Sequence, residues 1–361
     1  MERTHTSLRR GWTTGSCATA AARAAWNGLC GGEFPDPVTI TLPGGQSVAF
    51  ALAAHGHEGD GAWAAVVKDA GDDPDVTHGA HVRVDVHRGP PGSGVVFQAG
   101  DGVGTVTLPG LPIPPGEPAI NPVPRHMIRT ALRDVAGREP DVVVTVSIAG
   151  GRAMARHTLN GRLGIVGGLS ILGTTGIVVP FSCAAWIDSI HRGVDVARAL
   201  DLPHVAGCTG DVSERATRAL YGLPEEAMLE MGDFAGGLLK YLRRHPVGRV
   251  TIGGGVAKMT KLAQGFLDLH SRRGQADMTR LADLARDIAA PDAVVAAIAQ
   301  AHSVAAAFAL AQQAGFPLGP AVARGAWACA RDVLAGCDCM LDVLLFDRAG
   351  QLVARYGPSP V

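Results

Sequence analysis

Four aspartates lie within seven positions of the segment Lys68–Thr77, KDAGDDPDVT, and carboxylates at this density can do chemistry. Their oxygen atoms suit a hard cation. Neighbouring carboxylates also raise one another's pKa, which can prepare a general base, so Asp72 and Asp73 are candidate catalytic residues. The alternative is a solvated turn in which Asp and Pro only set the backbone. The nearby histidines lack the spacing of metal ligands on a helix, and we therefore assign no protein-bound metal.

Gly100–Gly104, GDGVG, matches part of a phosphate-binding glycine pattern and places Asp101 between two glycines. A dinucleotide-binding fingerprint must follow a strand and open a helix. Strand-like Thr105–Leu108 follows this segment instead. We therefore reject dinucleotide binding, and with it a nicotinamide-dependent oxidoreductase.

Thr13, Thr14, Gly15 and Ser16 immediately precede Cys17–Leu29, which is rich in alanine and predicts a helix. Hydroxyl side chains at this position cap the free N–H groups of a helix. The same helix end attracts anions through its dipole and its free N–H groups. The segment therefore predicts either a plain capped helix start or a ligand-binding loop.

Leu163–Ile187 contains no charged residue and is long enough to cross a bilayer, which needs about 20 apolar residues. Several glycines and Pro180 make it a poor helix, so we reject a membrane span. The segment predicts buried, irregular backbone whose N–H and C=O groups need partners. A ligand rich in acceptors is one such partner; the alternative is glycine-lined packing between two layers. The candidate binding residues are Gly167, Gly168, Thr174, Thr175 and Gly176.

The composition is that of a globular protein. The 361 residues suggest two domains, and hydrophobic residues make up 47% against 18% charged. A net charge of -1 gives no electrostatic footprint for nucleic acid. Seven scattered cysteines do not indicate a disulfide framework, and Arg9 and Arg10 interrupt any N-terminal signal core. We expect a cytoplasmic protein without nucleic-acid or membrane partners; a homo-oligomer stays open.

Two kinds of architecture are expected along the chain. Residues 1–138 contain hairpin signals and one clear early helix, which predicts a two-layer α+β domain with mixed or antiparallel strands. Val142–Ile148 is a continuous β-branched run, typical of a strand buried on both faces. Strands, glycine loops and helices then alternate, which predicts a Rossmann-like α/β domain with a largely parallel sheet over residues 139–361. Lys258 and Lys261 follow the triple glycine there, where either an anion or solvent is their partner.

The motifs together resemble the cobalt-precorrin-5B C(1)-methyltransferase family, the CbiD family of cobalamin biosynthesis. The segments that carry the resemblance are RRGWTTGSCA (Arg9–Ala18), KDAGDDPDVT (Lys68–Thr77), GDGVGTVTLPGL (Gly100–Leu111), GEPAINPVPR (Gly116–Arg125) and LGIVGGLSILGTTGIV (Leu163–Val178). They span nearly the whole chain in order. Ser16 stands where the family more often has Thr, and Gly253–Lys258 lacks a histidine expected near it.

The resemblance implies an enzyme that transfers a methyl group from S-adenosylmethionine to ring carbon C-1 of a cobalt-containing tetrapyrrole. The cobalt arrives with the substrate. The donor is already activated, so positioning should supply most of the catalysis, with a base as an aid. The implied donor-binding residues are Thr13, Thr14, Gly15, Ser16, Gly102, Gly104, Gly167, Gly168, Thr174, Thr175 and Gly176.

Asp101 is the leading candidate for a catalytic residue under this resemblance, because it can orient the donor or accept a ring proton. The substrate carries many carboxylates, for which Arg9, Arg10, Arg125 and Arg162 are candidate partners. We expect the motif loops to meet in a cleft between the two domains. The alternative function is a non-catalytic corrinoid-binding protein.

Overall fold

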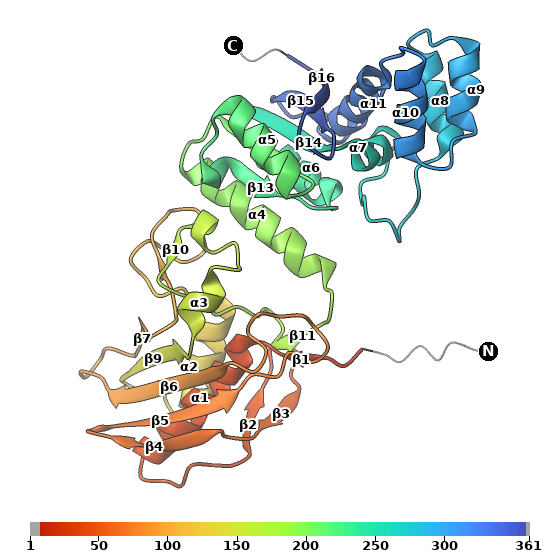
Figure 1. Ribbon diagram of the computed structural model, residues 1–361. Coiled ribbons are helices and arrows are strands. Elements are labelled where there is room, and N and C mark those ends of the chain that lie inside the picture. The colour runs from red at the N-terminus through yellow and green to blue at the C-terminus, as the bar shows by residue number, and fades with distance from the viewer. Residues whose placement is uncertain (1–7, 359–361) are drawn as a thin grey trace, which may run out of the picture. The chain divides into compact units, whose positions relative to one another are not determined.

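The computed structural model describes residues 8–358, which form two compact units dividing between Cys183 and Ala184 (Figure 1). The division lies after Cys183 rather than near residue 138. The reason is strand β9 (Val142–Ile148), which pairs with two strands of the first unit. Residues 139–183 therefore belong with the N-terminal part of the chain.

The first unit is built on a five-stranded sheet of order β4-β5-β6-β9-β7. Neighbouring strands are antiparallel except β7 and β9, which are parallel. The strands are β4 (Ala54–Glu58), β5 (Gly61–Val67), β6 (His81–Arg88), β7 (Val95–Ala99) and β9. The mixed sheet agrees with the prediction. Buried and half-buried residues alternate along β9, however, so it is not buried on both faces as expected.

Two helices cover the sheet of the first unit. Helix α1 (Thr14–Leu29) contacts β5 and β6, and α2 (Pro122–Ala136) packs on α1. The α1 face against the sheet is mostly alanine, including Ala18, Ala21 and Ala25, all fully buried. Small side chains let the helix lie close to the strands. The predicted hairpin is confirmed as β2 (Val38–Thr41) paired with β3 (Ser47–Phe50).

Shorter elements of the first unit join the motif segments. They are β1 (Gly11–Trp12), β8 (Thr105–Val106), α3 (Gly151–Ala155), the 3-10 helix η1 (Gly161–Leu163), β10 (Ile165–Val166) and β11 (Ile177–Val178). Strand β1 pairs with β11, and β10 pairs with β8, both antiparallel. The glycine-rich segment is irregular backbone held by short strands, as predicted, up to α4, which begins at Cys183. The predicted burial was wrong for much of it, because Val166, Leu172 and Phe181 are exposed. No described helix is long and apolar enough to cross a membrane.

The second unit contains a five-stranded sheet of order β13-β12-β14-β15-β16, parallel except for β16. The strands are β12 (His204–Cys208), β13 (Met228–Glu230), β14 (Arg249–Gly255), β15 (Met340–Phe346) and β16 (Leu352–Tyr356). The largely parallel sheet was predicted.

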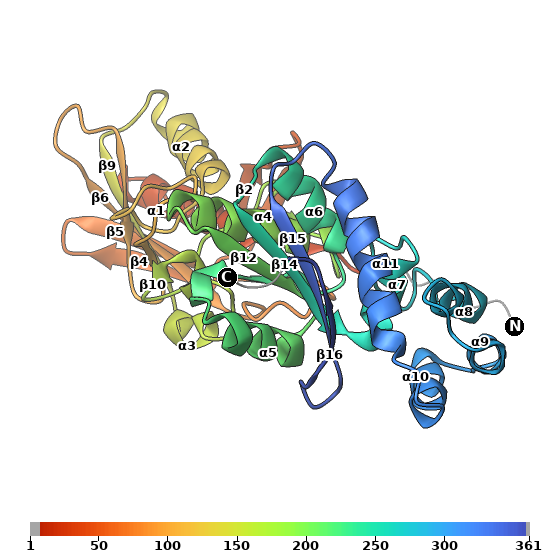
Figure 2. The same ribbon diagram turned by 90° about the horizontal axis from the view of Figure 1, so that it is seen from above.

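Helices lie on both faces of this sheet (Figure 2). Helix α5 (Asp211–Tyr221) covers one face, over the small cluster of Ala206, Cys208 and Met228. The other face carries the large core of the unit. The helices on that side include α4 (Cys183–Ala199), α6 (Ala235–Arg244), α7 (Val256–Ala263) and α11 (Leu318–Val333).

Three further helices extend this core. They are α8 (Met278–Arg286), α9 (Asp292–Ala299) and α10 (Val304–Gln313). The short 3-10 helix η2 (Glu225–Ala227) leads into β13.

A buried polar network crosses the sheet of the second unit. Asp342 on β15 is fully buried and accepts hydrogen bonds from Tyr221, from Thr251 at 3.0 Å and from Arg249 at 3.1 Å. Burial, and then the bond to Asp342, raise the pKa of Tyr221 to about 12. The network satisfies a carboxylate that would otherwise be costly inside the unit.

Candidate functional site

Every residue proposed for the site from the sequence lies in the first unit. The start of α1 packs directly on the glycine-rich segment. The N–H of Thr13 donates to the carbonyl of Gly176 at 3.1 Å, and the N–H of Gly15 donates to that of Leu172 at 3.2 Å. Two segments far apart in the sequence are thus joined through their backbones.

The hydroxyl groups of this helix start have partners inside the unit. Thr13 caps α1 by accepting from the N–H of Ser16 at 3.2 Å, and the hydroxyl of Ser16 donates to the carbonyl of Gly176 at 2.8 Å. Thr14, Gly15 and Ser16 are buried. The structure therefore agrees with the plain capped helix start, which was one of the two readings of this segment.

Gly100–Gly104 packs on the other end of the glycine-rich segment. The N–H of Leu169 donates to the carbonyl of Gly102 at 2.9 Å, and the N–H of Gly104 donates to that of Leu169 at 2.8 Å. Gly102 has φ +75, and a Cβ there would lie 2.1 Å from the carbonyl oxygen of Ile148. A Cβ on Gly168 would lie 2.3 Å from the carbonyl oxygen of Gly102. Close backbone packing requires both glycines. Strand β8 follows this segment, as predicted.

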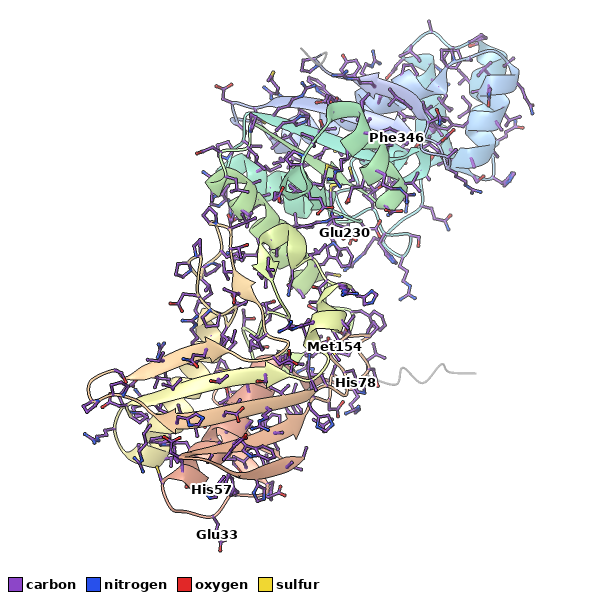
Figure 3. All side chains as sticks on the ribbon, turned by 60° about the vertical axis from the view of Figure 1, so that its left-hand side comes forward. Glu33, His57, His78, Met154, Glu230 and Phe346 are labelled. Carbon is purple, nitrogen blue, oxygen red and sulfur yellow. The ribbon has the colours of Figure 1, made fainter. Side chains whose placement is uncertain are left out.

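Asp101 projects from this packed loop into solvent. Its side chain is 73% exposed, and Oδ1 lies 3.1 Å from Nε of Arg152 on α3, the helix in which Figure 3 labels Met154. An exposed ion pair contributes little to stability, so both groups are available to a ligand. Sequence reasoning missed Arg152. The available signal was its position a few residues after the β-branched run Val142–Ile148, at the start of a short helix.

The acidic segment does not gather its carboxylates at one point. Asp69 pairs with the guanidinium of Arg9, and Asp72 accepts the N–H of Arg9 at 2.6 Å. Asp73 accepts the N–H of Phe181 at 2.8 Å. Over residues 8–358, no group of three or more His, Cys, Asp or Glu side chains is arranged to hold a metal ion. These contacts favour the turn reading over a base, because Asp72 and Asp73 each hold another segment.

Asp75 forms the most buried contact of this loop. Its carboxylate pairs with the ammonium of Lys68, which is only 3% exposed, and accepts the N–H of Thr77 at 2.8 Å and its hydroxyl at 2.6 Å. Burial acts to raise the pKa of Asp75, but the charge of Lys68 and these hydrogen bonds outweigh it and lower the pKa. The pair anchors the loop.

The basic candidates differ in what they contact. Arg9 holds the pKa of Asp69 at about 2 through its hydrogen bond and charge. Arg125 donates to the carbonyls of Ile120 and Pro118, and its guanidinium lies 5.2 Å from the ring centre of Phe97. Arg125 is thus a structural residue. Arg10 is exposed and Arg162 is half-buried.

The sequence-predicted residues therefore separate into two sets by exposure. The buried set holds the loops together and consists of Thr13, Thr14, Gly15, Ser16, Gly102, Gly104, Gly168 and Gly176. Asp72, Asp101, Gly167, Thr174 and Thr175 are exposed, and Asp73 is half-buried. A ligand on this surface would meet the exposed set.

Comparison with known proteins gives a consistent result. The CbiD family profile matches residues 1–180, and that of the CbiD C-terminal domain matches residues 268–357. The cobalt-precorrin-5B C(1)-methyltransferase of Bradyrhizobium sp. is 60% identical over 96% of this chain and 93% of its own length. The protein of that name from Agrobacterium fabrum is 58% identical over 100% of this chain and 96% of its own.

A solved structure also matches. It is a crystal structure of the cobalamin biosynthesis protein (cbiD) from Archaeoglobus fulgidus, 28% identical, with a TM-score of 0.41. The match covers 74% of this chain and 83% of that one. The profile matches and the identity along nearly the whole of two curated relatives agree with the motifs of the first unit, and the chain belongs to the CbiD family.

Proposed function

We propose that the protein is a cobalt-precorrin-5B C(1)-methyltransferase, which methylates C-1 of cobalt-precorrin-5B to give cobalt-precorrin-6A in cobalamin biosynthesis. The observation that carries this proposal is 53–60% identity to eight curated proteins of that name, over at least 96% of this chain. The methyl donor is S-adenosylmethionine, and cobalt is part of the substrate. We propose a cytoplasmic location for the enzyme.

The chemistry requires positioning more than activation. The ring carbon forms a bond to the methyl carbon while the methyl–sulfur bond breaks, and its electron pair stays on sulfur. The sulfonium is a good leaving group, so a nucleophilic side chain is not needed. Holding the two reacting atoms in line supplies most of the rate enhancement. Rigid loops serve this purpose, and the interlocked backbones of Gly102, Leu169 and Gly176 provide them.

The exposed residues of the first-unit loops are proposed to contact a reactant. Asp101 and Arg152 offer a carboxylate and a guanidinium on one surface, supported by their exposure and 3.1 Å separation. The guanidinium suits the acidic side chains of the tetrapyrrole. The carboxylate either orients a reactant or accepts the ring proton. Gly167, Thr174 and Thr175 extend the same proposal to the glycine-rich segment, whose buried residues hold its shape.

We also propose that the second unit is Rossmann-like in its first part. Two crossover units, β12–α5–β13 and β13–α6–β14, build parallel strands with helices on opposite faces. The support for this proposal is the position of β12 between β13 and β14 in the sheet.

Methyl transfer from labelled donor tests the function directly. The purified protein is incubated anaerobically with methyl-labelled S-adenosylmethionine and cobalt-precorrin-5B, and label is measured in the tetrapyrrole. We expect one labelled methyl group per ring, at C-1, and none without protein. Tetrapyrrole binding without label transfer would instead indicate a non-catalytic corrinoid-binding protein.

Asp101→Asn separates the roles of this carboxylate, because it keeps the shape and removes the charge. If Asp101 is the base, the rate should fall by about 10²–10⁴ with binding little changed. If it binds the donor, the KM for S-adenosylmethionine should rise instead. Asp283→Asn is a matched control, since Asp283 is also an exposed aspartate paired with an arginine, on α8. Normal kinetics of folded Asp101→Asn would remove Asp101 from the site.

A further inference from the structure

The carboxyl ends of β12, β13 and β14 meet at one edge of the second unit's sheet. From β12 the chain crosses to β13 on one side, and it then returns past β12 to form β14 on the other side. The direction of the connections therefore reverses between β12 and β14. Open parallel sheets bind ligands outside the carboxyl ends of their strands at such a reversal.

Packing explains Gly253 and Gly254 at this edge, but it does not explain Gly210 and Gly255. A Cβ on Gly253 would lie 2.7 Å from the hydroxyl of Thr217, and one on Gly254 would lie 2.7 Å from the sulfur of Met259. At Gly210 and Gly255, by contrast, a Cβ would meet nothing within 4 Å. Their backbones are extended or ordinary, with φ 165 and φ -68, so conformation does not require glycine either. Close approach of a ligand to the backbone would explain both.

Lys258 joins the three loops of this edge. Its Nζ donates to the carbonyl of Thr209 after β12 at 2.8 Å, and lies 3.1 Å from Oδ1 of Asp233 after β13. The second contact is an ion pair without hydrogen-bond geometry, because that buried oxygen accepts no hydrogen bond from residues 8–358. An ammonium has three donors, so Lys258 keeps donors for an anionic ligand group. Lys261, the other lysine of α7, instead donates to the carbonyl of Leu269 at 3.0 Å.

Glu230 and Trp186 complete the edge. Glu230, labelled in Figure 3, is the last residue of β13 and follows Gly210 by about 20 residues. A carboxylate at this place in a βαβ unit binds the hydroxyls of a ribose. The indole N–H of Trp186 donates to the carbonyl of Glu230 at 3.1 Å, yet the side chain is 42% exposed. An exposed indole held at a fixed place is a stacking surface for a purine.

We infer that this edge binds S-adenosylmethionine, with the ribose on Glu230, the adenine on Trp186, and the amino-acid carboxylate near Lys258. The inference rests on the proposed function for the identity of the ligand. It assigns the donor to residues of the second unit; in the first unit, the hydroxyls of Thr13 and Ser16 already have partners. At Gly210 and Gly255, where a Cβ would meet nothing within 4 Å, the ligand can approach the protein backbone closely.

Titration calorimetry of the full chain with S-adenosylhomocysteine tests the inference. Losing a charge-assisted hydrogen bond in Glu230→Gln should raise the Kd about 10- to 100-fold. Trp186→Ala should raise it about 10-fold, and Trp186→Phe should restore most of the affinity. Glu226→Gln is the matched control, because Glu226 is also half-buried but precedes the amino end of β13. Its Kd should be that of the native protein, and all variants should keep the native Tm.

The outcomes separate the inference from the proposed function. If Glu230→Gln and Trp186→Ala bind S-adenosylhomocysteine as tightly as the native protein, the inference is overturned. Methyl transfer by the native protein would still uphold the proposed function in that case. Binding that depends on Glu230, in a protein that transfers no methyl group, would uphold the inference and overturn the function. A native protein that binds no S-adenosylhomocysteine would overturn the inference. Equal losses in Glu230→Gln and Glu226→Gln would also overturn it.

Discussion

The buried pair of Lys68 and Asp75 predicts an asymmetric effect of removing either partner. Asp75→Asn removes the negative charge beside the ammonium of Lys68, which is 3% exposed and also donates to the hydroxyl of Thr77. Breaking a buried pair in this way costs about 3–5 kcal/mol. Lys68→Met leaves a carboxylate that is 22% exposed and still accepts two hydrogen bonds from Thr77. We therefore expect a smaller loss, about 1–3 kcal/mol.

Urea unfolding followed by circular dichroism at pH 7 measures both losses. The double variant, with both Asp75→Asn and Lys68→Met, should lose less stability than the two single variants together, because neither charge is then left without its partner. Asp69→Asn is the matched control in the same loop: its exposed pair with Arg9 should contribute less than about 1 kcal/mol.

The contribution of the Lys68–Asp75 pair to folding stability should decrease at low pH. The pKa of Asp75 is lower in the folded protein than in the unfolded chain. Asp75 therefore contributes to folding stability above its unfolded pKa of about 3.9, and this contribution is lost as the pH falls through its folded pKa. The gap between native protein and Asp75→Asn should shrink below about pH 4. An Asp75→Asn protein as stable as Asp69→Asn but unable to transfer methyl groups would refute the structural role.

Two further substitutions test the packing. Gly102→Ala should cost clearly more stability than Gly116→Ala. Both have positive φ, which costs about 1–2 kcal/mol with a Cβ, but only Gly102 would also collide with a carbonyl; equal losses by urea unfolding would contradict this. Asp342→Asn should cost about 3–5 kcal/mol, because Arg249, 11% exposed, loses its charged partner. A thermal scan that leaves the Tm unchanged would show that the network is not stabilising.

Local signals in the sequence were enough for several elements. The hydroxyls before an alanine-rich run correctly predicted a capped helix, and the hairpin signals of residues 1–138 correctly predicted a hairpin, which is β2 paired with β3. Strand β9 was predicted, but its environment was not. Thr145 and Ser147 occupy alternate positions of that run and face the less buried side. This alternation indicates a strand in a sheet that is covered on one face only. Such a strand fits the N-terminal sheet, so the alternation would have placed the domain division after β9.

Long-range partners could not be predicted from spacing. The four aspartates of the acidic segment look equivalent in sequence, yet two contact Arg9, one contacts Phe181 and one contacts Lys68. Each partner depends on how distant segments pack, and no local pattern carries that information. The same holds for Arg152, whose contact with Asp101 arises only once β9 lies beside the loop. The motifs therefore predicted the family better than they predicted the role of each residue.

Glycine richness has two different causes in this chain, and the difference bears on where a ligand binds. In the first unit, a Cβ on Gly102 or Gly168 would collide with a backbone carbonyl of a neighbouring segment, so packing within the protein explains those glycines. Their presence is thus no evidence for a donor site. At Gly210 and Gly255 a Cβ would meet nothing, and neither position needs an unusual backbone. A glycine that packing does not require, at an edge where parallel strands end, is better evidence for a bound molecule than a glycine-rich motif.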